Sequence, residues 1–141
     1  MKTFEIIDIS GDVGMRAFGA TVEEAFINEA MGMYSLITDI EGIEVTQKVV
    51  IETKSDSLEG LLVSYLNELI FQFDAYGFIG KSLDINILSI EPSAFLKATV
   101  HGEEFNPEKH ERKLLIKAAT YHKVRIEKVS DMWEIDVIFD I

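Results

Sequence analysis

Carboxylate-bearing residues lie near both ends of this chain. The opening segment reads Asp8-Ile9-Ser10-Gly11-Asp12-Val13-Gly14, and the chain ends with Val137-Ile138-Phe139-Asp140-Ile141. If the fold brings the two ends together, the side chains of Asp12 and Asp140 and the carboxylate of Ile141 converge as hard oxygen ligands. Calcium and magnesium prefer such ligands. The alternative is an acidic turn and a solvated last residue, which is common at chain termini.

The surroundings of these carboxylates leave room for a ligand. Gly11 and Gly14 flank Asp12 and allow the backbone to turn tightly or to approach an ion. Alternation in the last segment places Asp140 on the polar face of a strand. Two Asp side chains and a terminal carboxylate bring a charge of about −3 to one place, which is unfavourable without a cation or a proton. A metal site therefore depends on whether the two ends meet.

Other catalytic chemistry has no positive support in the sequence. The three histidines are His101, His110 and His122. None is four residues from another, so no helical zinc pair is encoded. We expect His122 to be partly buried in a strand and His110 to be solvated in a charged loop. There is no cysteine, no Gly-x-Ser-x-Gly elbow, no phosphate-binding glycine loop and no EF-hand spacing. The sequence predicts a protein that is not an enzyme.

Composition limits the class of partner. The 141 residues are 48% apolar with a net charge of −12, which favours one globular domain over a disordered chain. Nucleic acid binding draws its affinity mainly from Lys and Arg, so we expect a protein partner and no strong direct contact with nucleic acid. No apolar run is long enough to cross a bilayer, and residues 1–20 lack a signal-peptide core. We therefore expect a soluble, cytoplasmic protein.

Two helices stand out in the hydrophobic pattern. The first begins at Thr21, where Thr21 and Glu24 form a capping box, and Gly42 is its predicted stop. The second begins at Asp56 or Ser57 and ends between Asp74 and Gly77, with a wide apolar stripe typical of a core helix.

Strands account for most of the remaining chain. Alternation or β-branched residues predict strands over 15–18, 45–53, 83–90, 94–101, 114–122, 123–128 and 132–140. Residues 83–90 alternate through Leu83, Ile85 and Ile87 and form a hairpin with 94–101. The last strand points Trp133, Ile135, Val137 and Phe139 inward and Ile138 and Asp140 outward. The predicted class is α+β, a single domain with a mostly antiparallel or mixed sheet packed against two principal helices.

Almost the whole chain resembles the archease family. Five blocks carry the resemblance in order: residues 4–19, residues 22–26, residues 61–70, Gly102-Glu103 with His110 and residues 116–122, and the closing Asp140-Ile141. Each block alone is weak, but five blocks in order that end at the same place are specific. The resemblance implies one archease-like domain over residues 1–141.

The resemblance also implies a function and a site. Archeases are protein cofactors of the tRNA-splicing RNA ligase of the RtcB type, whose guanylylation and multiple turnover they promote. They are also described as chaperone-like modulators of a tRNA cytosine methyltransferase. The family holds a divalent cation, calcium first with magnesium or manganese as alternatives. Carried over, the ligands are Asp12, Asp140 and Ile141, while Asp8 matches the acidic position of the same block and whether it joins the site is left open.

The opening block departs from the family pattern. Ile9 stands where the family has His, Ser10 where it has Thr and Gly11 where it has Ala, while Asn106 replaces a frequent acidic residue before the loop. The first change excludes any role that needs an imidazole at that position. Asp12 and Asp140 are retained, so the metal hypothesis stands. A metal-dependent hydrolase is a third hypothesis, which would require activity without a partner.

Overall fold

The first helix begins where the capping motif predicts but ends earlier. In this computed structural model, which describes residues 2–141, α1 spans Val22–Ile37, and Thr21 Oγ1 accepts the N–H of Glu24 at 3.1 Å. The predicted stop at Gly42 was wrong, because residues 40–42 form a separate 3₁₀ turn, η1 (Ile40–Gly42). The N–H of Lys113 donates to the carbonyl oxygen of Ile37 at 2.8 Å, so a distant loop takes the bond that a longer helix would make.

The second helix agrees with its prediction at both ends. α2 spans Leu58–Tyr76 and is capped by Ser57, whose Oγ accepts the N–H of Gly60 at 2.9 Å. Gly77 follows with φ of 70°, the left-handed conformation in which glycine commonly ends a helix.

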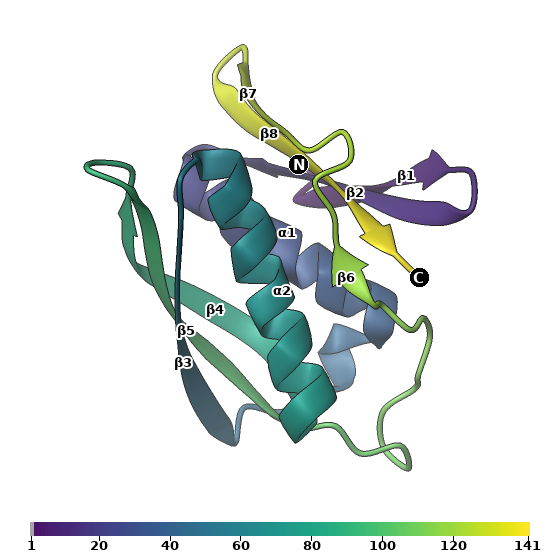
Figure 1. The fold of residues 1–141 in the computed structure, drawn as a ribbon. Coiled ribbons are helices and arrows are strands. Elements are labelled where there is room, and N and C mark those ends of the chain that lie inside the picture. The colour runs from purple at the N-terminus through teal and green to yellow at the C-terminus, as the bar shows by residue number, and fades with distance from the viewer. Residues whose placement is uncertain (1) are drawn as a thin grey trace.

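Two antiparallel sheets pack against the two helices (Figure 1). One sheet has the order β3 (Gln47–Ser55), β5 (Ala94–Glu104), β4 (Phe78–Ser89). The other runs β1 (Phe4–Ile9), β2 (Asp12–Gly19), β8 (Met132–Asp140), β6 (Ala118–Ala119), and β7 (Arg125–Val129) also pairs with β8. α1 packs against β2 of one sheet and β4 of the other, while α2 lies on β3 and against β6. The α+β class is confirmed, with two sheets and only antiparallel pairs.

The predicted β4–β5 hairpin forms, but a bulge near its outer end makes the following side chains of β4 point to the face opposite to the one expected. The register slips between Ile85 and Ile87, so Leu88 comes to lie opposite Leu96. Ile87 is 47% exposed as a result. A bulge of this kind cannot be read from simple alternation.

Two strands of the last third, β6 and β7, are shorter than predicted. The expected strand over 114–122 reduces to the two residues of β6, and His122 lies exposed in the turn before β7 rather than partly buried. In β8, Ile135, Val137 and Phe139 are buried as predicted. Ile138 was expected to face solvent but is 4% exposed, because it sits in an apolar row with Gly14 of β2 and Ile7 of β1.

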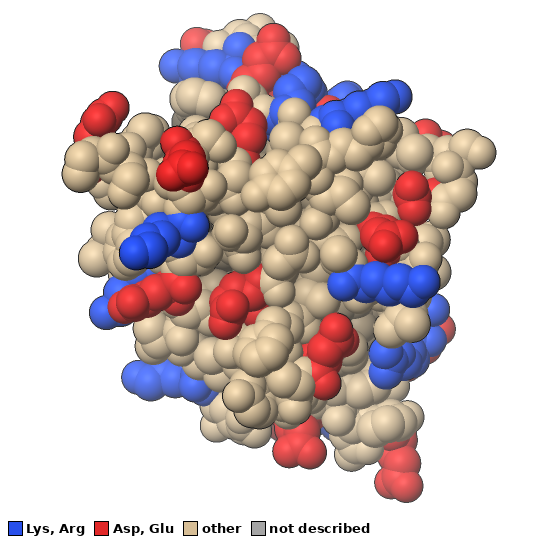
Figure 2. Space-filling model, viewed as in Figure 1, with Lys and Arg blue, Asp and Glu red and all other residues tan. Residues whose placement is uncertain are grey.

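Charged side chains are dispersed over the surface. Figure 2 shows acidic and basic groups scattered among uncharged surface on the face that α2 occupies. Within residues 2–141, no helix is both long and apolar enough to span a membrane.

Candidate metal centre

Neighbouring strands bring Asp12 and Asp140 to the same end of one sheet. The antiparallel ladder of β2 and β8 runs to the pair Val13 and Phe139. Asp12 and Asp140 are the next residues of the two strands, one register step beyond that pair. Residues opposite one another in antiparallel strands point to the same face of the sheet. The β1–β2 turn and the C-terminal end of β8 therefore lie next to one another, as the metal hypothesis requires.

A tight turn sets the start of β2. Ile9 of β1 pairs with Asp12 across the turn at Ser10 and Gly11, and Gly11 has φ of +82°, a conformation that favours glycine. Gly14, by contrast, lies inside β2 and contributes no turn.

The C-terminal residue lies directly beyond Asp140. Ile141 comes after the end of β8 and is 38% exposed, and the C-terminus lies beside β6 on the side of the β1–β2 turn (Figure 1). The N–H of Lys117 donates to the carbonyl oxygen of Asp140 at 2.8 Å. The end of β8 is therefore held by β2 on one side and by Lys117 on the other.

The donor set fits a hard divalent cation. Asp12 and Asp140 are exposed, and within residues 2–141 no Lys, Arg or His nitrogen pairs with either carboxylate. The same residues contain no group of three His, Asp or Glu side chains that could hold a metal. A site at this end would therefore use two carboxylate side chains, the terminal carboxylate and water or backbone oxygens, all of which suit calcium.

Asp8 and Ile9 take different positions. Asp8 pairs with Val13, so it belongs to the opposite face of the sheet from Asp12. Ile9, which replaces the family His, pairs with Asp12 itself. The side chain beside the candidate ligand is thus apolar and cannot bind a metal or move a proton.

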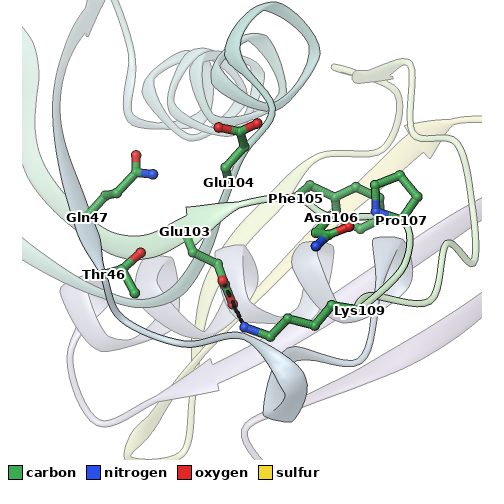
Figure 3. Close-up of a pocket in the computed structure, with 8 residues that line it drawn as sticks. All are labelled: Thr46, Gln47, Glu103, Glu104, Phe105, Asn106, Pro107 and Lys109. Atoms are coloured by element: carbon green, nitrogen blue, oxygen red, sulfur yellow. Dashed lines mark hydrogen bonds and ion pairs between the residues drawn. The ribbon is translucent and has the colours of Figure 1, made fainter.

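A polar hollow of about 440 Å³ opens beside the loop after β5 (Figure 3). Its lining residues are Thr46, Gln47, Glu103, Glu104, Phe105, Asn106, Pro107 and Lys109. The Glu103 carboxylate accepts the backbone N–H of Glu44, and Lys109 Nζ donates to both of its oxygens at 3.0 and 3.1 Å. His110 Nε2 lies 3.0 Å from Glu103 Oε2. These donors, the Glu44 N–H foremost, lower the pKa of Glu103 to about 2.

The hydrogen bonds around His110 fix its tautomer. The backbone N–H of Asn106 donates to Nδ1 at 2.9 Å, so Nδ1 carries no proton and Nε2–H donates to Glu103. His110 is 3% exposed, so the expectation of a solvated side chain was wrong. Because the Glu103 oxygens are used within the protein, this cluster locks the loop in place and leaves no free group for chemistry.

The arginines of the other sheet are also engaged. Arg16 donates through Nε and Nη2 to both oxygens of Asp136, at 2.8 and 3.1 Å, and Arg125 Nε donates to the same carboxylate at 3.0 Å. Arg125 also pairs with Glu134 and Glu127. Guanidinium groups held in this way have little capacity left for phosphates.

Glu29 is the residue that sequence analysis missed altogether. It lies on the buried face of α1 with no exposed surface, and neither carboxylate oxygen has a hydrogen-bond partner within residues 2–141. Burial, aided by the nearby charge of Asp136, raises the pKa of Glu29 well above 4.5. Its position at helical spacing among apolar residues was the available signal.

These features define a small α+β protein with two antiparallel sheets and two neighbouring aspartates where the β1–β2 turn adjoins the end of β8. Residues 4–141 match the sequence profile of the Archease protein family (MTH1598/TM1083). The chain belongs to the archease family.

Individual relatives cover the full length. Protein archease of Pyrococcus furiosus is 34% identical over 142 residues, which cover 100% of both chains. Protein archease of Thermococcus kodakarensis is 37% identical over 131 residues, covering 93% of this chain and 92% of the relative.

Solved structures share the fold. The solution structure of Methanobacterium thermoautotrophicum protein 1598 has a TM-score of 0.87 and 32% identity, with 100% of both chains covered. A crystal structure of an archease from Thermotoga maritima, described as a possible chaperone, has a TM-score of 0.62. At 20% identity, with 96% of this chain and 94% of the other covered, it supports the fold alone.

Proposed function

We propose that this chain is a protein cofactor of an RtcB-type tRNA-splicing RNA ligase, and that it promotes guanylylation of the ligase and multiple turnover. The chain acts on its partner and catalyses no reaction of its own. It carries a divalent metal site, with calcium as the first choice, formed by Asp12, Asp140 and the carboxylate of Ile141.

The single observation that carries this proposal is the adjacency of Asp12 and Asp140 at one end of the sheet. Asp12 and Asp140 lie one position beyond the pair Val13 and Phe139, which ends the β2–β8 ladder. Neither carboxylate forms an ion pair among residues 2–141. Two carboxylates placed together without a counter-ion repel one another unless they share a cation or a proton. When bound, a divalent cation supplies that charge and fixes the start of β2 to the end of β8.

The charge of the chain supports a basic partner. An RNA ligase needs a basic cleft to hold its substrate, and a chain with a net charge of −12 is complementary to such a cleft. The acidic end of the sheet, with Asp12, Asp140 and the terminal carboxylate, is the surface that we assign to that contact.

Replacement of the two aspartates tests the proposal. Asp12→Ala and Asp140→Ala should abolish calcium binding measured by isothermal titration calorimetry and should reduce guanylylation and turnover of a purified RtcB-type ligase. Asp8→Ala is the matched control, because it removes a carboxylate from the opposite face of the same hairpin. Wild-type protein that binds no divalent cation, or variants that activate the ligase fully, would contradict the proposal.

The alternative is a chaperone-like modulator of a tRNA cytosine methyltransferase with a structural metal. The observation in its favour is that the T. maritima archease of the same fold is described as a possible chaperone. A purely structural metal predicts that Asp12→Ala lowers the melting temperature and leaves ligase turnover intact in the folded protein. Loss of turnover at an unchanged melting temperature excludes that alternative. Hydrolysis by the isolated protein would instead support the metal-dependent hydrolase.

A further inference from the structure

One side chain of α2 bonds both backbone groups of a residue in β6. Asn67 Nδ2 donates to the carbonyl oxygen of Ala119 at 3.1 Å, and Asn67 Oδ1 accepts the N–H of Ala119 at 2.8 Å. A carboxamide offers one acceptor and two donors, so it can replace the backbone of a neighbouring strand. Since β6 is the end of the strand order, Asn67 occupies the place of a missing strand along its open edge.

β6 in turn holds the end of the last strand. Ala118 pairs with Asp140 and Ala119 pairs with Phe139. The N–H of Lys117 adds a bond to the carbonyl oxygen of Asp140. The C-terminal end of β8 thus lies between β2 and β6, and the outer edge of β6 is fixed to α2 through Asn67.

The inner edge of β6 is held to β8 by Lys117 and by Thr120, whose N–H and Oγ1 both donate to the carbonyl oxygen of Ile138, but its own side chains add little on the outer edge. β6 consists of two alanines, of which Ala119 is buried and Ala118 is half-buried. Short strands with small side chains bury too little surface to be stable alone, and chain termini fray unless they are tied down. The two Asn67 bonds supply an anchor that the alanine side chains cannot.

We propose that Asn67 is a positioning residue for the metal centre, which it orients through β6 without being a ligand. This inference rests on the metal centre assigned under the proposed function. Asn67 holds β6, and β6 fixes the backbone from which the Asp140 side chain and the Ile141 carboxylate project. Removal of groups that orient metal ligands commonly weakens metal affinity about 10- to 100-fold.

Calcium titrations of the full chain test this role. Asn67→Ala should weaken calcium binding at least roughly tenfold relative to wild type. Asn28→Ala is the matched control, because Asn28 Nδ2 donates to the carbonyl oxygen of Phe18 at 2.7 Å at the far end of β2. That variant loses a side-chain bond between α1 and the same sheet, so whatever thermal stability it loses, it should bind calcium as the wild type does.

A second measurement uses wild-type protein and needs no variant to fold. Coupling between two sites is reciprocal, so bound calcium must strengthen the contact between Asn67 and β6. Saturating calcium should slow hydrogen exchange of the Ala119 amide. The Gly60 amide, which also donates to a side-chain oxygen but lies at the start of α2, should not respond.

The outcomes separate this inference from the function on which it rests. Equal calcium affinity in Asn67→Ala and Asn28→Ala, or unchanged exchange at Ala119 while calcium binds, overturns the role of Asn67 and leaves the metal centre in place. Wild-type protein that binds no calcium overturns both.

Discussion

His110 and Glu103 form a buried contact that joins the end of β5 to the loop after it. The Nε2–H of His110 donates to Glu103 Oε2 at 3.0 Å, and His110 is 3% exposed. The same carboxylate accepts the N–H of Glu44, so the end of β5, the loop after it and the segment before β3 are fixed to one another. The contact ties the end of β5 to the loop that leads toward β6.

Replacement of this histidine should destabilise the protein without affecting metal binding. His110→Ala leaves the Asn106 N–H and the Glu103 carboxylate each without one partner, so the free energy of unfolding should fall by about 2 kcal/mol. Urea denaturation measures the change. His101→Ala is the control, because His101 makes an exposed contact with Asp84 that is worth little. Equal losses in the two variants would show that the buried contact is not special.

Glu103 should make the protein sensitive to acid. Its pKa is about 2 in the folded protein against an ordinary value of 4.5, so between these values the unfolded chain binds more protons than the folded chain. The contribution of Glu103 to stability is therefore complete above about pH 4.5 and is lost as the pH falls toward 2. The difference in urea midpoint between wild type and Glu103→Gln should shrink over that range. A constant difference from pH 6 to pH 2.5 would contradict this account.

Glu29 should make the folded protein less stable as the pH rises, the opposite of the effect of Glu103. Its folded-state pKa is raised above 4.5 by burial, so in the range above 4.5 the folded chain holds a proton that the unfolded chain has released. The stability associated with the protonated carboxyl is present below pH 4.5 and declines as the pH rises toward the folded-state pKa. Glu29→Leu removes the two unpartnered oxygens and should raise the free energy of unfolding at neutral pH by about 1–3 kcal/mol.

A pH series checks the Glu29 prediction. The advantage of Glu29→Leu over wild type should grow from pH 4.5 upward, while Glu29→Gln should show a difference from Leu that does not vary with pH. Parallel stability curves for wild type and Glu29→Leu would mean that the carboxyl finds solvent or a partner on ionisation.

Local sequence signals predicted the ends of the helices where no distant residue contacts them. Ser57 and Gly77 mark the ends of α2 correctly, because a hydroxyl cap and a left-handed glycine act within one turn of the helix. The end of α1 was missed because Lys113 satisfies the carbonyl oxygen of Ile37 across 76 residues of sequence, a partner that periodicity cannot reveal.

At the candidate site, too, local signals identified residues but not their distant contacts. Alternation placed Asp140 on a strand and the full-length resemblance selected Asp12, but only the β2–β8 register shows that the two positions are neighbours. The anchoring role of Asn67 has no sequence signal, since an asparagine on the polar side of a helix usually faces solvent. The buried state of His110 depends on Glu103 and on the Asn106 backbone, which meet only after the loop folds.

The final carboxylate should contribute to metal affinity through its position rather than through the Ile141 side chain. A Gly-Ser extension after Ile141 converts the terminal carboxylate into a neutral peptide carbonyl and removes one negative charge from the site. Since calcium affinity depends on the number of charged ligands, binding should weaken at least roughly tenfold. Calcium at 100 times the dissociation constant should stabilise the untagged protein by about 2.7 kcal/mol, and at the same concentration it should stabilise the extended protein by less.

Two comparisons distinguish a role of the terminal charge from a general effect of the added residues. The same Gly-Ser extension before Lys2, whose side chain is 72% exposed, should leave calcium affinity unchanged. Ile141→Val keeps the carboxylate and shortens the side chain, so it should bind calcium as the wild type does. If the C-terminal extension binds calcium with unchanged affinity, the terminal carboxylate is not a ligand. Asp12 and Asp140 would then have to recruit their remaining oxygens from water, backbone carbonyls or neighbouring side chains.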